Sequence, residues 1–89
     1  MPREFFKDPD AVLDYQVDWS DWLDSDTILS SDWTVPTGIT EDSDTNTTTT
    51  ATIWLSSGTV GTEYSLVNRI VTAGGRTEDR TIIIKVRGR

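Results

Sequence analysis

Every second residue is apolar over long stretches of this chain, and that alternation is the pattern of half-buried β-strands. The clearest case is residues 13–19, LDYQVDW. A period of two places the leucine, tyrosine, valine and tryptophan on one face of an extended chain and the acidic and amide side chains on the other. The segment predicts a strand, and the acidic turn that follows it carries Trp22.

Later segments repeat the pattern. Residues 27–35 alternate again, and Pro36 ends the run because proline has no N–H to give to a sheet. The expected core face of this strand holds Leu29, Ser31, Trp33 and Val35. A short edge strand is expected near Ile39, and the acidic residues 41–44 are expected to form a solvated loop.

The second half of the chain holds three more candidate strands. Residues 50–55 and 81–86 alternate and are rich in β-branched side chains, which suit extended structure. Residues 63–72 carry apolar side chains on both faces, as in a strand that is buried on both sides. The glycine pair in residues 73–76, AGGR, predicts a hairpin turn, because glycine accepts the positive φ values that such turns require.

The expected fold is all-β: an immunoglobulin-like antiparallel β-sandwich of six or seven strands. It would occupy residues 11–87, with residues 1–10 as an N-terminal arm. Tyr64 stands where such sandwiches often place a tyrosine whose hydroxyl ties down a corner; an ordinary core or rim tyrosine is the alternative.

Composition excludes several kinds of chemistry. The 89 residues include no cysteine and no histidine, which excludes a disulfide scaffold, a thiolate zinc site and an imidazole base. We expect no enzymatic activity and no cofactor. There is no long apolar run and no basic segment followed by an apolar one, so we expect neither a membrane span nor a secretory signal, and synthesis in the cytoplasm.

The charge of −7 is unevenly divided along the chain. Residues 1–44 hold twelve acids and two bases, whereas residues 45–89 hold three acids and six bases. This balance disfavours nucleic acid as a partner, because phosphate binding needs a dominant basic field. It permits head-to-tail contact between copies, and a core this small favours a homo-oligomer or multi-copy assembly. The acids at positions 18, 21, 24 and 26 are expected to be a solvated turn, with calcium binding as the alternative.

Six residues are candidates for contact with a partner, either as aromatic side chains outside the expected core faces or as arginines near the last turn. Tryptophan in particular is enriched both in cores and at interface hot spots. The candidates are Phe5, Phe6, Trp22, Trp54, Arg76 and Arg80. The alternatives are that the phenylalanine pair caps the edge of its own core and that the arginines form ion pairs within the chain. Exposed aromatics among acids and threonines also leave weak binding of glycans open.

The chain resembles small proteins of tailed bacteriophages and prophages whose genes lie among those for head and head-completion proteins. The resemblance is carried by residues 7–15 (KDPDAVLDY), 18–23 (DWSDWL), 26–28 (DTI), 33–36 (WTVP), 68–72 (NRIVT) and 75–80 (GRTEDR). It implies a virion protein that binds major capsid or neck proteins, with capsid decoration in many copies as the leading expectation. A neck, tail or fibre accessory and a carbohydrate-binding adhesion module are the alternatives.

Overall fold

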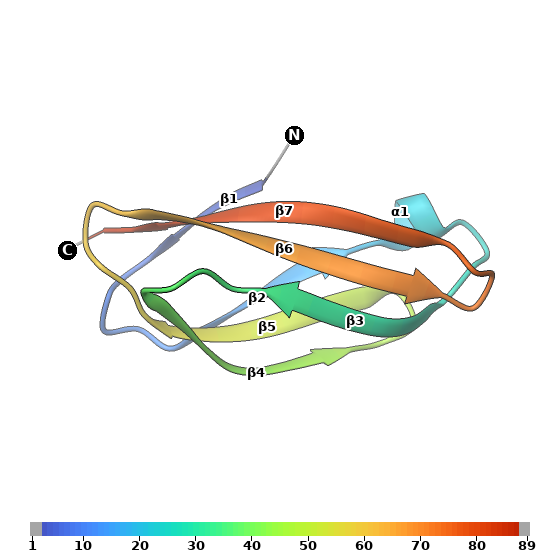
Figure 1. Cartoon of the computed structure of the whole chain (residues 1–89), viewed down its shortest axis with the longest axis horizontal. Helices are drawn as coiled ribbons and strands as arrows, with labels where there is room; N and C mark the ends of the chain where they lie inside the picture. Colours follow the sequence, from blue (N-terminus) through green and yellow to red (C-terminus); the bar gives the residue numbers. More distant parts are fainter. Residues whose placement is uncertain (1–2, 88–89) are drawn as a thin grey trace.

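The computed structural model describes residues 3–87, which form two β-sheets packed face to face (Figure 1). Seven strands and one short helix follow one another along the chain. They are β1 (Arg3–Lys7), β2 (Leu13–Asp18), α1 (Ser20–Leu23), β3 (Ile28–Thr34), β4 (Ile39–Asn46), β5 (Thr50–Ser57), β6 (Glu63–Thr72) and β7 (Thr77–Val86). The prediction of an all-β protein is confirmed.

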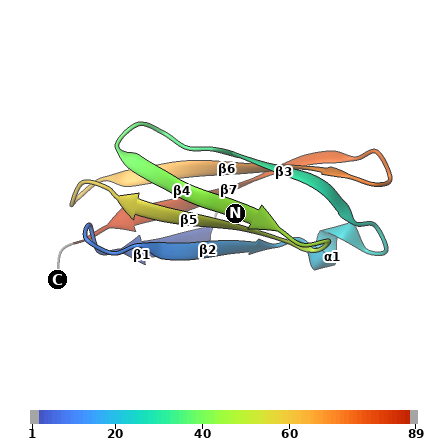
Figure 2. The same cartoon turned by 90° about the horizontal axis from the view of Figure 1, so that it is seen from below.

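One sheet has four strands in the order β1-β7-β6-β3, and the other has three in the order β2-β5-β4. We call these the four-stranded and the three-stranded sheet; in Figure 2 the two sheets overlap, with β4 and β5 in front of β6 and β7. All pairings are antiparallel except that of β1 with β7. The connection from β2 to β3 passes from one sheet to the other, as does that from β3 to β4.

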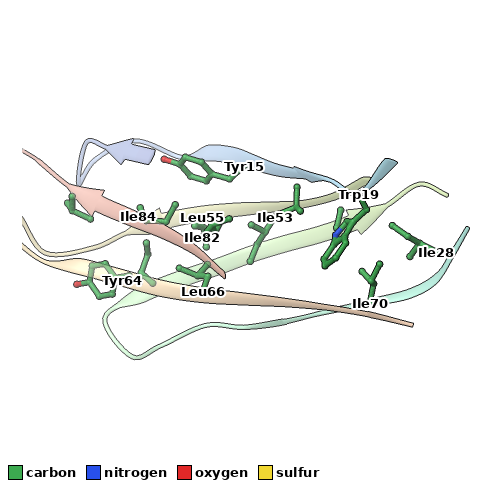
Figure 3. Close-up of a cluster of buried hydrophobic side chains, with 14 of the residues drawn as sticks. Tyr15, Trp19, Ile28, Ile53, Leu55, Tyr64, Leu66, Ile70, Ile82 and Ile84 are labelled. Atoms are coloured by element: carbon green, nitrogen blue, oxygen red, sulfur yellow. The ribbon is translucent and has the colours of Figure 1, made fainter. Parts of the chain in front are cut away.

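The core lies between the sheets and follows the alternation of the sequence. Every second side chain of β5 and β6 is buried, as the period of two requires. Figure 3 shows these side chains between the two layers. The buried apolar residues are Tyr15, Val17, Trp19, Leu23, Ile28, Ile39, Ala51, Ile53, Leu55, Tyr64, Leu66, Ile70, Ile82, Ile84 and Val86.

Two sequence expectations for β3 and β4 were wrong. Leu29 is 67% exposed rather than part of the core face, because a bulge between Ile28 and Ser30 shifts the alternation and Ile28 becomes the buried residue. Residues 41–44 are not a loop but the middle of β4, which pairs with β5 along its whole length around a second bulge. Acidic side chains are tolerated there because β4 is an edge strand, and charge discourages pairing with foreign strands.

Residues 3–7, within the expected arm, form β1 and extend the four-stranded sheet beside β7. Lys7 closes this strand. Its side chain is buried, and its Nζ donates to the carbonyl oxygens of Ser57 at 2.6 Å and Asp8 at 2.9 Å. Burial lowers the pKa of Lys7, and the negative charges of nearby acids partly offset this effect. The lysine thereby ties the start of the chain to the end of β5.

Tyr64 ties down the corner at this same end of the molecule. Its hydroxyl accepts a hydrogen bond of 3.0 Å from the backbone N–H of Thr59, five residues upstream. Hydrogen bonds from Thr59 lower the pKa of Tyr64. Gly38 lies against the ring: a Cβ on this glycine would be 3.0 Å from the phenol carbon Cε1. The hydroxyl of Tyr64 thus holds the turn before β6, while its ring is part of the core.

Candidate functional site

Three of the six candidate contact residues meet at the end of the molecule that carries α1. The rings of Trp19 and Trp22 pack edge to face, with centroids 5.5 Å apart. The guanidinium of Arg76 lies 4.2 Å above Trp22, and that of Arg80 lies 4.3 Å above Trp19. We call these four residues the tryptophan-arginine cluster. Each arginine covers one indole, which fits the preference of cations for aromatic faces.

Hydrogen bonds to the backbone hold the arginines of this cluster in place. Arg76 donates through Nη2 to the carbonyl of Leu23 at 2.9 Å and through Nε to the carboxylate of Asp26 at 3.2 Å. Arg80 donates through Nη1 to the carbonyl of Asp18 at 3.0 Å. Both arginines therefore connect the β6–β7 hairpin to the segment around α1. Several N–H groups of both guanidiniums thus already have partners within the chain.

Asp26 accepts several of the hydrogen bonds that hold this end of the molecule together. Its carboxylate accepts the backbone N–H of Thr27 at 2.8 Å and of Gly74 at 3.0 Å, in addition to Arg76. These bonds, with that from the Thr72 hydroxyl as the largest cause, lower the pKa of Asp26 to about 2. Residues 3–87 hold no group of three or more acids placed to bind a metal ion. The carboxylate of Asp26 thus binds backbone N–H groups of two segments that lie far apart in the sequence.

A buried amide joins the cluster to the core. The Trp19 Nε1–H donates to Oδ1 of Asn68 at 2.9 Å, and both residues are fully buried. The Nδ2 of Asn68 donates in turn to Oγ of Ser31 at 2.8 Å and to the carbonyl of Asp32 at 3.1 Å. The sequence analysis did not single out Asn68, although its inward position in an otherwise apolar alternation was a usable signal, since buried amides are normally bonded.

The two phenylalanines of β1 have different surroundings. Phe5 packs against the core, with its ring 5.2 Å from that of Tyr15. Phe6 points outward, is 55% exposed, and carries the guanidinium of Arg87 at 4.4 Å above its ring. The pair is therefore divided between the core and the surface, as successive residues of a strand must be.

Among the residues of the three strands β2, β4 and β5, Trp54 is the one aromatic on the outer face of the sheet. It is 40% exposed and opposes Asp14 on β2 and Ser43 on β4. Asp42, in the bulge next to Ser43, accepts a hydrogen bond of 2.9 Å from Ser56 Oγ. The structure thus gathers Trp22, Arg76 and Arg80 and keeps the phenylalanines and Trp54 apart from them.

One feature of β4 was missed by the sequence analysis. Glu41 and Asp44 share a hydrogen bond, which is the largest cause that raises the pKa of Glu41 to about 7; partial burial and the charge of Asp44 act in the same direction. The two acids looked like solvated loop residues because the bulge that brings them together is invisible in the sequence.

The described residues contain no helix with the length and apolar character that a membrane span requires.

Comparison with protein-family models gives a match over most of the chain. A family model described as "Podophage GP4 fiber-tail adaptor protein gp77" matches residues 7–85, which include β2 to β6, α1 and nearly all of β7. The match confirms that this is a phage protein. A search of curated proteins found no match.

Proposed function

The chain belongs to the podophage GP4 fiber-tail adaptor protein family, and from this premise we propose that it is a non-enzymatic virion protein that joins a tail fibre to the tail. The observation that carries the proposal is the extent of the match, which spans the two sheets rather than one segment. The family description favours the tail or fibre accessory over capsid decoration, which it does not support.

The shape of the molecule suits a connecting role. Its extents are 42 × 24 × 19 Å, so its two ends are far apart relative to its width. The corner at Tyr64 and the buried Lys7 form one end, and the tryptophan-arginine cluster forms the other (Figure 1). An adaptor needs two separable surfaces, and an elongated sandwich has them without any internal hinge.

We also propose that the sandwich is immunoglobulin-like. In constant-type immunoglobulin domains the second strand pairs with the fifth and the fifth with the fourth, while the third, sixth and seventh form the other sheet. The order β2-β5-β4 against β7-β6-β3 has this arrangement, with β1 added beside β7. The Tyr64 hydroxyl bond at the start of β6 corresponds to the tyrosine corner of such domains.

Among the six candidate contact residues, the side chains best placed to meet a partner are Phe6 and Trp54, which are the most exposed aromatics. The other candidates make contacts mainly within the chain. The two arginines stack on tryptophans, Trp22 is one of the rings they cover, and Phe5 packs against the core. Self-association of the chain, expected from its small core, stays a prediction.

The proposal is tested by reconstitution. Purified wild-type chain is mixed with the tail fibre protein of the same phage and with tail particles that lack fibres, and complexes are followed by sedimentation. We expect the fibre to join the tail only when the chain is present, and the copy number in virions to follow that of the fibres. Attachment of fibres without the chain, or hundreds of copies on fibreless heads, would refute the adaptor role.

A further inference from the structure

The charges of the molecule are divided between its two sheets. The strands of the three-stranded sheet hold five acids and no lysine or arginine, whereas the strands of the four-stranded sheet hold five of each. Of these five acids, Asp14, Asp18 and Asp42 lie on the outer face of the three-stranded sheet, which has no basic residue in its strands. A surface of a single charge sign attracts a partner surface of the opposite sign.

Trp54 stands within this acidic face. Strand pairing puts Asp14 beside it on β2, and Asp42 lies next to its other neighbour, Ser43, on β4. Between residues 3 and 87 no lysine or arginine comes within ion-pair distance of Asp14 or Asp42, and the Lys7 amine, whose charge Asp42 feels, donates instead to two carbonyls. The face thus combines an indole with two carboxylates that form no ion pair with the described side chains.

Elsewhere the chain covers three of its aromatic rings with arginine. Arg76 lies over Trp22, Arg80 over Trp19 and Arg87 over Phe6, at 4.2 to 4.4 Å from the ring centroids. The described residues place no guanidinium over Trp54. Arg69 is paired with Asp79 at 2.7 Å, so the arginines at 69, 76, 80 and 87 all have internal partners. These four arginines are therefore poor candidates for a contact with Trp54 of a second copy.

We propose that the outer face of the three-stranded sheet docks a cationic surface of a different protein, which places an arginine on the Trp54 indole between Asp14 and Asp42. The inference rests on the proposed adaptor function, in which the partner is one of the two proteins that the chain joins. Planar guanidinium stacks on indole and forms paired bonds with carboxylate. Exclusion of water at the centre of an interface strengthens both contacts.

The test measures binding of the chain to the purified fibre protein and to fibreless tails, in a series of salt concentrations. The variants are Trp54→Ala, Trp54→Leu and the double change Asp14→Asn with Asp42→Asn. The matched control is Asp32→Asn with Glu78→Gln, which removes two charges from the four-stranded sheet. Far-UV circular dichroism and thermal unfolding check that each variant is folded.

We expect one of the two partners to bind about tenfold or more weakly to both Trp54 variants, because leucine keeps apolar area but offers no aromatic face. The Asp14 and Asp42 change should weaken the same binding and flatten its salt dependence, while the control changes neither. If wild-type chain binds but Trp54→Leu binds equally well, or binding ignores salt, the arginine-docking inference is refuted and the adaptor role stands. Competition by free glycans would assign the face to sugar and also refute it. If wild-type chain binds neither protein, both proposals fail.

Discussion

Asn68→Ala should be among the most destabilising single changes in the chain. The change leaves the Trp19 Nε1–H fully buried without its acceptor, and a buried unpaired donor costs about 1–3 kcal/mol. It also removes both donors of the amide to β3 and leaves a small cavity, which adds about 1 kcal/mol. The expected loss is about 3 kcal/mol in the free energy of unfolding, or roughly 15 °C in Tm for a domain of this size.

Urea and thermal unfolding followed by circular dichroism measure this loss. Gln16→Ala is the matched control, because it deletes an amide whose 3.4 Å bond to Thr52 lies on an exposed face, and it should change stability by less than about 0.5 kcal/mol. Combining Asn68→Leu with Trp19→Phe removes both polar partners and should cost less than the sum of the single changes. Additive losses, or an Asn68→Ala loss below about 1 kcal/mol, would refute the role given to the network.

Three further predictions concern charge and backbone. The pKa of Glu41 is raised to about 7 in the folded protein, against 4.5 in the unfolded chain, so it contributes stability that is present below pH 4.5 and lost as the pH rises through 7. Glu41→Gln should therefore stabilise the protein at pH 8 by about 1 kcal/mol, given the partial exposure of the side chain, and by little at pH 4. Urea titrations at both pH values measure these differences. The lowered pKa of Asp26, about 2, has the opposite sign, since its contribution is present above pH 3.8 and is lost as the pH falls through 2. Asp26→Asn should therefore destabilise the protein at pH 7, and the difference in Tm should shrink as the pH falls towards 2. Gly58→Ala should cost about 3 kcal/mol, because a Cβ would lie 2.7 Å from Val86 Cγ2 at a φ of +105°, whereas Gly61→Ala, at a φ of +84° with open space around it, should cost only about 1 kcal/mol in the same unfolding assay.

The strands that the sequence predicted well are those whose alternation is unbroken. The bounds 63–72 agree with β6 at both ends, and the hairpin after it follows from its paired glycines. The errors arise at bulges: one inserted residue turned Leu29 outward, and another hid β4 within an acidic stretch. A bulge depends on what the partner strand requires, so a single segment does not reveal it.

The candidate contact residues were found by type but not by arrangement. Their aromatic and basic character is visible in the sequence, yet the stacking of Arg76 on Trp22 joins residues 54 positions apart and depends on the completed sandwich. The division of the phenylalanines between core and surface likewise follows from the parallel pairing of β1 with β7, a contact between the two ends of the chain. Such long-range pairings leave no local trace in composition or spacing.

The parallel pairing of β1 with β7 has a mechanical consequence. Arg3 lies opposite Ile82 and Lys7 opposite Val86. Because the two strands run in the same direction, the chain enters β1 at one end of the pair and leaves β7 at the opposite end. A force that pulls the segments before β1 and after β7 apart slides the two strands along each other. It therefore loads their hydrogen bonds together in shear instead of opening them one at a time. A part that transmits tension between a fibre and a tail would resist rupture best when pulled in this direction.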